Sequence, residues 1–195
     1  MTADDIQLGS GCDIAPDARI GDVDGVAGDT VIGDGATIRA GTVIYPDVVV
    51  GDGLTTGHDA LIREDTTLGD DVLVGTQTVI DGNVEVGSHV SMQTGVYVPR
   101  RTEIGDNVFL GPRAVLTNDA YPIRRESELE GVELEDHVTV GANATLLPGI
   151  TVSSGSFVAA GSVVTDDVPP ETLALGVPAV HRPLPEELVG GNLIA

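Results

Sequence analysis

His58 and Asp59 are adjacent in the segment TTGHDALIRED, residues 55–65, and this pair has the chemistry of a general base. A histidine whose pKa is near its ordinary value of about 6.5 can accept a proton at neutral pH. A neighbouring carboxylate can fix the tautomer of the imidazole and stabilise its protonated form. The alternative is that His58 is a solvated surface residue, which is the commoner fate of a lone histidine. Which role applies depends on the elements that position the pair.

The charge of the chain limits what can bind to it. The sequence has 31 acidic residues, nine arginines and no lysine, which gives a formal net charge of -22. Nucleic acids and anionic membrane surfaces need cationic footprints, so neither is expected as a partner. Salt at molar concentration shortens the Debye length to about 3 Å and relieves the self-repulsion of such a chain. We therefore expect a protein of a halophilic cytoplasm.

Cysteine count and hydropathy favour the same compartment. Cys12 is the single cysteine, so an intramolecular disulfide is excluded. The start MTADDIQLGS has neither the basic nor the apolar region of a signal peptide, and no apolar run approaches the length that spans a membrane. We expect a cytoplasmic protein without membrane insertion.

An aliphatic residue recurs at every sixth position through most of the chain. Thr56, beside His58, is the single polar exception in this series. The first run comprises Leu8, Ile14, Ile20, Val26, Ile32, Ile38, Ile44, Val50, Thr56, Ile62, Leu68, Val74, Ile80, Val86, Met92, Val98, Ile104, Leu110 and Leu116. After a break the series resumes at Leu134, Val140, Leu146, Val152, Val158 and Val164.

A period of six is three times the two-residue alternation of a strand and does not fit a helix. Short strands joined by regular turns satisfy it, and three such hexads make one triangular coil. The 27 positions from Leu8 to Val164 correspond to nine coils, a few positions being taken up by the break. Stacked coils would form an all-β prism roughly 40 Å long with an aliphatic interior. A ligand must then bind outside the prism or between subunits.

These hexads resemble the hexapeptide-repeat acyltransferases, which implies a left-handed parallel β-helix. We assign residues 1–168 to the helix, with an extruded loop at 118–133 that is polar and contains Pro122 and Gly131. Residues 169–195, with paired prolines and the segment LALGVPA, resemble the C-terminal cap of that family. A short acidic helix is expected near Pro185 to Val189.

The TGHD stretch resembles a motif of bacterial sugar N-acetyltransferases and sialic-acid O-acetyltransferases. In those enzymes a histidine and an acidic residue precede an isoleucine by four and three positions, as His58 and Asp59 precede Ile62 here. The resemblance implies that His58 is the base and that Asp59 orients it. The family glycine whose amide binds the oxyanion lies one coil after the histidine. Here Gly82 of IDGNV lies one hexad beyond that point, and Thr76 occupies the stacked position.

The second half resembles galactoside acetyltransferases and aminouronate N-acetyltransferases. Its motifs are VFLGPRAVLTNDAYP, VTVGANATLLPGITV and VAAGSVVTDDVPPETLALGVPA. Tyr121 stands where the galactoside enzymes have a catalytic histidine, whereas the aminouronate enzymes also lack it and share the Thr117–Asn118 pair. His58 is therefore the expected base, with Gln93, Asn118 and Tyr121 as polar contacts to substrate. Arg124 is a candidate contact to an anionic sugar or a phosphate.

The same resemblance implies a homotrimer with acetyl-CoA in a groove between subunits. Residues that match coenzyme contacts are Ala142, Ala160 and Thr165, with Thr76 or Gly82 at the acyl end. The family often has cationic residues where Asp166 and Val180 stand, which leaves Arg182 or His181 for the phosphates.

The predicted function is N-acetylation of a nucleotide-linked amino sugar by acetyl-CoA, without a metal. Sugar O-acetylation and a non-catalytic scaffold remain alternatives, and surface-glycan synthesis is the pathway we expect. A γ-class carbonic anhydrase shares the prism fold, but it needs three histidines around zinc, two of them closely spaced in sequence. No two of His58, His89, His137 and His181 are close in the sequence, so this class is disfavoured.

Overall fold

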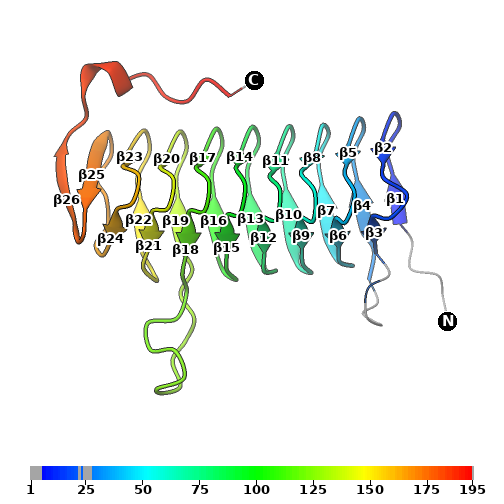
Figure 1. Ribbon diagram of the computed structural model, residues 1–195, viewed down its shortest axis with the longest axis horizontal. Helices are drawn as coiled ribbons and strands as arrows, with labels where there is room; N and C mark the ends of the chain where they lie inside the picture. The colour runs from blue at the N-terminus through cyan, green and yellow to red at the C-terminus, as the bar shows by residue number, and fades with distance from the viewer. Residues whose placement is uncertain (1–5, 22, 24–27, 195) are drawn as a thin grey trace.

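The computed structural model describes residues 6–21, 23 and 28–194, and these form a three-sided prism of stacked coils (Figure 1). Each complete coil contributes one short strand to each of three parallel sheets, here called walls A, B and C. This three-sided parallel β-helix confirms the predicted fold class.

The walls are built mostly from very short strands. Wall A contains β1 (Ile6–Leu8), β4 (Thr30–Ile32), β7 (Val48–Val50), β10 (Thr66–Leu68), β13 (Val84–Val86), β16 (Glu103–Ile104), β19 (Glu133–Leu134) and β22 (Thr151–Val152). Wall B contains β2 (Asp13–Ile14), β5 (Thr37–Ile38), β8 (Thr55–Thr56), β11 (Leu73–Val74), β14 (Ser91–Met92), β17 (Phe109–Leu110), β20 (Thr139–Val140), β23 (Phe157–Val158), β25 (Thr172–Gly176) and β26 (Ala179–Pro183). Wall C contains β3 (Arg19–Ile20), β6 (Val43–Ile44), β9 (Leu61–Ile62), β12 (Val79–Ile80), β15 (Tyr97–Val98), β18 (Val115–Leu116), β21 (Thr145–Leu146) and β24 (Val163–Val164).

The aliphatic series fills the interior of the prism. The inward residues of the strands, from Ile32 to Val164, form one buried cluster. The polar exception, Thr56, is fully buried in this column and is hydrogen-bonded. Its Oγ1 lies 3.0 Å from Thr42 Oγ1 and accepts the backbone N–H of Arg39 at 2.9 Å. Thr56 therefore belongs to the core, just before the turn that carries His58.

The number of coils is smaller than predicted. The walls contain eight complete coils, and Val168 and β25 begin a ninth. Ile6 pairs with Thr30, so the first coil is one hexad longer than a regular coil. Val26, counted as a repeat position, lies outside the described residues. Glu103 pairs with Glu133 because the loop after β18 lengthens another coil by the equivalent of two hexads.

Two segments leave the regular stack. The loop between β18 and β19 projects from the corner between walls C and A (Figure 1). At the other end, β26 pairs antiparallel with β25, and a 3-10 helix, η1 (Glu186–Leu188), follows. The C-terminal segment then runs back over wall B, where Asn192 Nδ2 donates to the carbonyls of Asn107 and Val138 at 2.9 and 3.0 Å. No described helix is long and apolar enough to cross a membrane.

Candidate active site

His58 lies at the tip of the corner between walls B and C, which we call the histidine corner. The tips of successive coils stack in one column through hydrogen bonds between neighbouring coils. For example, Gln77 N donates to His58 O at 2.9 Å and Gly95 N donates to Thr76 O at 2.9 Å. The column contains Ala40, His58, Thr76, Thr94, Pro112, Ala142 and Ala160. His58, Thr76, Ala142 and Ala160 were predicted separately as site residues, and the structure places them along one edge.

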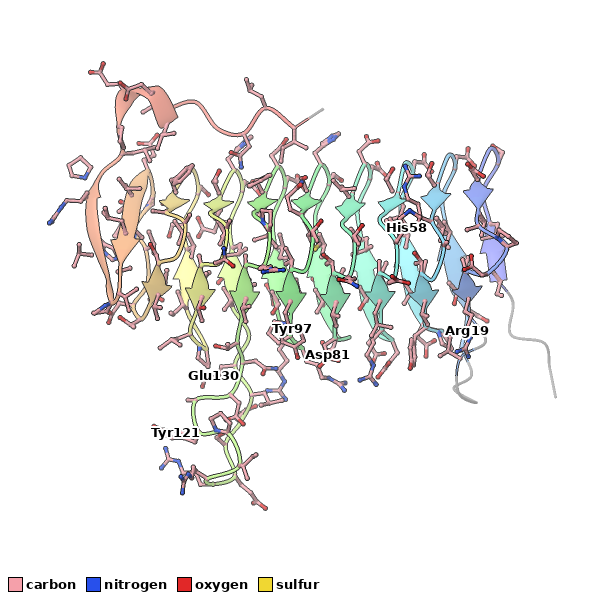
Figure 2. All side chains as sticks on the ribbon, viewed as in Figure 1. Arg19, His58, Asp81, Tyr97, Tyr121 and Glu130 are labelled. Carbon is pink, nitrogen blue, oxygen red and sulfur yellow. The ribbon has the colours of Figure 1, made fainter. Side chains whose placement is uncertain are left out.

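The surroundings of His58 leave its ring open to a ligand. The residue is exposed, and Figure 2 shows it on the body of the prism, away from the loop that carries Tyr121. Its backbone N–H donates to Thr76 Oγ1 at 3.3 Å. Gly57, the residue before it, lies so close to the Thr76 backbone that a Cβ would collide with it. The local backbone is therefore held by the following coil, while the imidazole faces outward.

Asp59 turns away from the following coil. It has a positive φ of 56°, and its carboxylate lies over Gly41 in the preceding coil. Among the described residues no hydrogen bond joins Asp59 to His58. The orienting role of Asp59 stays a prediction that a bound substrate would have to test.

The remaining predicted contacts divide between two corners. Gln93 lies in the turn of the histidine corner, two coils beyond His58, and its Nε2 donates to Ser91 Oγ at 2.8 Å. Gly82, Asn118 and Thr165 lie at the corner between walls C and A, which we call the loop corner. Asn118 Nδ2 donates to Arg100 O at 3.1 Å, and Thr165 Oγ1 donates to Asp166 Oδ2 at 2.7 Å. In a single chain these three are separated from His58 by wall C.

The extruded loop presents the other two predicted substrate contacts. Tyr121 and Arg124 are exposed on it, and the Arg125 guanidinium stacks 3.5 Å from the centre of the Tyr121 ring. The loop is held at its base because Arg101 Nη1 donates to Leu129 O at 2.7 Å and Glu128 Oε1 at 3.1 Å. Arg182 lies on β26 at the end of the prism, with exposed side chains on both sides of it.

Charge is distributed unevenly around the prism, which composition alone does not reveal. Eight of the nine arginines lie on wall C, on its two corners or on the loop: Arg19, Arg39, Arg63, Arg100, Arg101, Arg113, Arg124 and Arg125. Arg39 and Arg113 are exposed at the histidine corner, one coil before and three coils after His58. Counting three hexads at a time from His58 reaches Ala40 and Pro112, which are the sequence neighbours of these two arginines. They supply the cationic groups that an anionic ligand along this corner requires.

The described residues contain no group of three or more histidine, cysteine, aspartate or glutamate side chains arranged to hold a metal ion. His89 lies at the corner between walls A and B, where its Nδ1 is 3.6 Å from Asp71 Oδ2. His137 packs near Gly191 of the C-terminal segment. These histidines do not converge on His58.

Comparison with known proteins supports the repeat architecture. A model of the bacterial transferase hexapeptide (six repeats) matches residues 29–64, and a model of the hexapeptide repeat of succinyl-transferase matches residues 131–166. A hexapeptide transferase family protein from Anaplasma phagocytophilum has a similar structure, with a TM-score of 0.53 and 18% identity. The match covers 94% of this chain and 87% of that one, and at this identity it shows the fold alone.

Two curated relatives are enzymes of acetyl transfer. The galactoside O-acetyltransferase of Escherichia coli K12 is 35% identical over 75 residues, which is 35% of this chain and 37% of the relative. The 2,3,4,5-tetrahydropyridine-2,6-dicarboxylate N-acetyltransferase of Staphylococcus aureus RF122 is 52% identical over 48 residues, 25% of this chain and 20% of the relative. The chain thus spans less than half the length of the curated relatives it matches.

Proposed function

The chain belongs to the hexapeptide-repeat acyltransferase superfamily, and from this premise we propose that it transfers the acetyl group of acetyl-CoA to the amine of a nucleotide-linked amino sugar. The observation that carries the proposal is the histidine corner. An exposed histidine stands in one column with the small residues Ala142 and Ala160, so a long ligand can lie along this edge with its reacting end at His58.

The residues at the histidine corner suit acetyl-CoA. Small tips let a chain of amides approach the backbone, and Arg113, three coils beyond His58 in the same direction, can pair with phosphate oxygens. Coils stack at about 4.8 Å, so Ala142, four coils beyond His58, lies roughly 19 Å from it along the column. The acyl end then lies at His58 and Thr76, and the rest of the molecule extends toward the C-terminal end of the prism.

His58 acts as the general base. As the acceptor amine attacks the thioester carbonyl, the C–N bond forms and His58 takes the proton that the nitrogen releases. When the C–S bond breaks, the leaving sulfur takes up the electron pair and the imidazolium can return a proton to it. A base at this position is worth roughly a hundredfold to ten-thousandfold in rate.

The acceptor nucleophile could also be a hydroxyl, which the similarity to a galactoside O-acetyltransferase favours. A hydroxyl needs the same base, so the site does not separate the two reactions. An acceptor panel that pairs each amino sugar with its hydroxyl counterpart separates them.

We also propose a homotrimer that packs through wall C. The outward row of this wall is mostly apolar: besides Arg19 and Thr145 it comprises Val43, Leu61, Val79, Tyr97, Val115 and Val163. Its strands contain no acidic residue, whereas wall A has Glu85, Glu103 and Glu133. Copies that each have a net charge of -22 repel one another least through a face without carboxylates. Val79→Asp should therefore give monomers by light scattering, while Val49→Asp on wall A should leave the trimer intact.

The function is tested by the release of free thiol from acetyl-CoA. The assay is run in about 2 M KCl, where charge repulsion is screened, as expected for the salt-rich cytoplasm we propose. Acceptors are UDP- and dTDP-linked 3-amino and 4-amino sugars and their hydroxyl counterparts. Turnover with one acceptor, lost in a folded His58→Ala variant, supports the proposal. Full turnover in that variant contradicts the role of His58, and turnover with none of the acceptors contradicts the substrate class.

A further inference from the structure

A continuous polar network runs along the loop corner across four successive coils. Arg63 donates from Nε and Nη2 to the two carboxylate oxygens of Glu64 at 3.1 and 2.9 Å, and from Nη1 to Asp81 Oδ1 at 3.3 Å. The Tyr97 hydroxyl donates to Asp81 Oδ2 at 3.2 Å, and the Arg63 guanidinium lies 5.4 Å from the centre of the Tyr45 ring. We call these five residues the corner network.

Contacts within the corner network shift the pKa values of three of its members, Tyr97, Glu64 and Arg63. Burial and the neighbouring Asp81 raise the pKa of Tyr97, so the phenol keeps its proton. Burial favours the neutral form of Glu64, but hydrogen bonds from the backbone and Arg63 outweigh it and lower the pKa of this carboxyl. Hydrogen bonding to Glu64 raises the pKa of Arg63. Arg63 and Tyr97 therefore stay hydrogen-bond donors, and Glu64 stays an acceptor, over the physiological pH range.

The network has capacity for a ligand. Each carboxylate oxygen can accept two hydrogen bonds, so both oxygens of Asp81 have a lone pair left after bonding Arg63 and Tyr97. The side chain of Asp81 is 30% exposed and Tyr97 is 36% exposed. A carboxylate, a guanidinium and a phenol beside aromatic rings can bind the hydroxyls and the amine of a sugar. None of these residues belongs to the site described above.

The position of the network relative to His58 depends on assembly. In one chain Asp81 lies across wall C from His58, and Tyr97 lies on the wall itself in β15; Figure 2 shows His58 apart from both. Arg63 is in the same coil as His58, and β9 separates them. Packing through wall C around a threefold axis makes a head-to-tail contact, in which one edge of the wall meets the opposite edge of the next copy. An axis parallel to the prisms keeps equal coils at equal height, so the network of one copy faces His58 of its neighbour.

We propose that Asp81 and Tyr97 of one copy position the acceptor sugar at His58 of the neighbouring copy. The proposal rests on the transferase function and the wall C trimer proposed above. Asp81 accepts hydrogen bonds from the amine and a neighbouring hydroxyl, which points the nitrogen lone pair toward the thioester. The Tyr97 hydroxyl donates to Oδ2 of Asp81 and so holds the plane of the Asp81 carboxylate in place. Both are substrate-positioning residues, and proton transfer stays with His58.

The first test is kinetic and uses single variants. Asp81→Asn and Tyr97→Phe should raise KM for the acceptor about tenfold or more, as the loss of a hydrogen bond to a charged group implies. KM for acetyl-CoA and the melting temperature should change little. Glu85→Gln, an exposed carboxylate on wall A, is the matched control and should behave as wild type. An unchanged acceptor KM in both variants overturns the proposal.

The second test mixes two impaired chains and measures turnover at an acceptor concentration well below the wild-type KM, where Asp81→Asn alone is about tenfold slower than wild type. Refolding His58→Ala with Asp81→Asn in equal amounts creates trimers in which about a quarter of the interfaces combine an intact His58 with an intact Asp81. Recovery of about a quarter of wild-type turnover is the expected result. If both residues served one chain's own site, no interface would be intact and activity would stay at the level of the single variants.

A third test needs no activity. In a Cys12→Ser background, chains with His58→Cys are mixed with chains with Asp81→Cys and treated with a bifunctional maleimide. Cross-linked dimers should form in the mixture and not in either chain alone. If no cross-linked dimers form, residue 58 of one copy does not lie near residue 81 of the next, and the proposal is overturned even if the enzyme is active. If dimers form but wild type turns over none of the acceptors, the transferase function fails while the juxtaposition stands.

Discussion

Two corners of the same prism use their tips in opposite ways. At the corner between walls A and B, which we call the aspartate corner, Asp34, Asp52, Asp70, Asp106 and Asp136 each accept a backbone N–H from the preceding coil at 2.6 to 2.8 Å. At the described tips of the histidine corner, only Thr76 accepts such a bond. The first corner uses its side chains to hold the stack together, whereas the second leaves its side chains to face solvent. A carboxylate that bonds the preceding coil is engaged in holding the stack and offers less of its bonding capacity to a substrate.

The largest expected effect separates the two corners by activity. His58→Ala should lower turnover by roughly a hundredfold to ten-thousandfold, equivalent to about 3 to 5 kcal/mol in the barrier, because the base is lost. The free energy of unfolding should be unchanged, since the side chain is exposed. His89→Ala at the aspartate corner is the control and should keep full turnover. Thiol release measures turnover, and chemical denaturation measures the free energy of unfolding. Comparable turnover in His58→Ala and His89→Ala would contradict a catalytic role that is specific to the histidine corner.

The next effect comes from the glycines that let the coils approach. A methyl group on Gly57 would collide with the backbone N of Thr76, whereas one on Gly51 first meets the carboxylate of Asp70 and comes no closer than 2.9 Å to the Gly69 backbone. A backbone cannot move aside as a side chain can, so Gly57→Ala should cost about 1 to 3 kcal/mol of stability and also lower turnover. Gly51→Ala should cost less and leave turnover unchanged. Equal losses of stability and activity in the two variants would contradict the assignment.

The walls can be predicted from the sequence because the same requirement, one buried aliphatic side chain in each hexad, recurs in every coil. One inward aliphatic residue per hexad is enough to define the core, as the column through Ile62, Ile80 and Val98 shows. The same pattern overestimates the number of coils for a simple reason. An insertion whose length is a whole number of hexads keeps the aliphatic register, so the extra hexad of the first coil, in which Ile6 pairs with Thr30, cannot be distinguished from a repeat by period alone.

The site is less predictable because a corner is defined by every third hexad rather than by each one. Counting in this way places His58 beside Thr76 and assigns Gly82 to another corner, as the structure does. Counting hexads does not predict the direction of a side chain, so it could not predict that the Asp59 carboxylate lies over Gly41. The corner network is also hidden, because its members are ordinary surface types until coils stack them side by side.

A smaller effect is expected from the buried hydroxyl beneath the histidine corner. Thr56→Val keeps the volume but removes the acceptor of the Arg39 N–H and the partner of Thr42 Oγ1. A buried donor without an acceptor costs about 1 to 3 kcal/mol, so the unfolding free energy should fall by that amount. The double variant Thr42→Val with Thr56→Val should show how much of the loss arises from the hydroxyl pair. No loss of stability in the single variant would mean that this corner needs no internal acceptor.

The smallest effect should arise at a single tip of the aspartate corner. Asp52 Oδ1 accepts the N–H of Asp34 at 2.7 Å, and both residues are exposed. Asp52→Ala exposes that N–H to water rather than burying it, so the loss should be about 1 kcal/mol, with turnover unchanged. Asp52→Asn retains an acceptor oxygen and removes one charge from a very acidic edge, so it should be as stable as wild type. Denaturation at low and high salt separates the two causes, because the hydrogen bond persists when charge repulsion is screened. If Asp52→Ala lowered turnover as well, the two corners would not be independent.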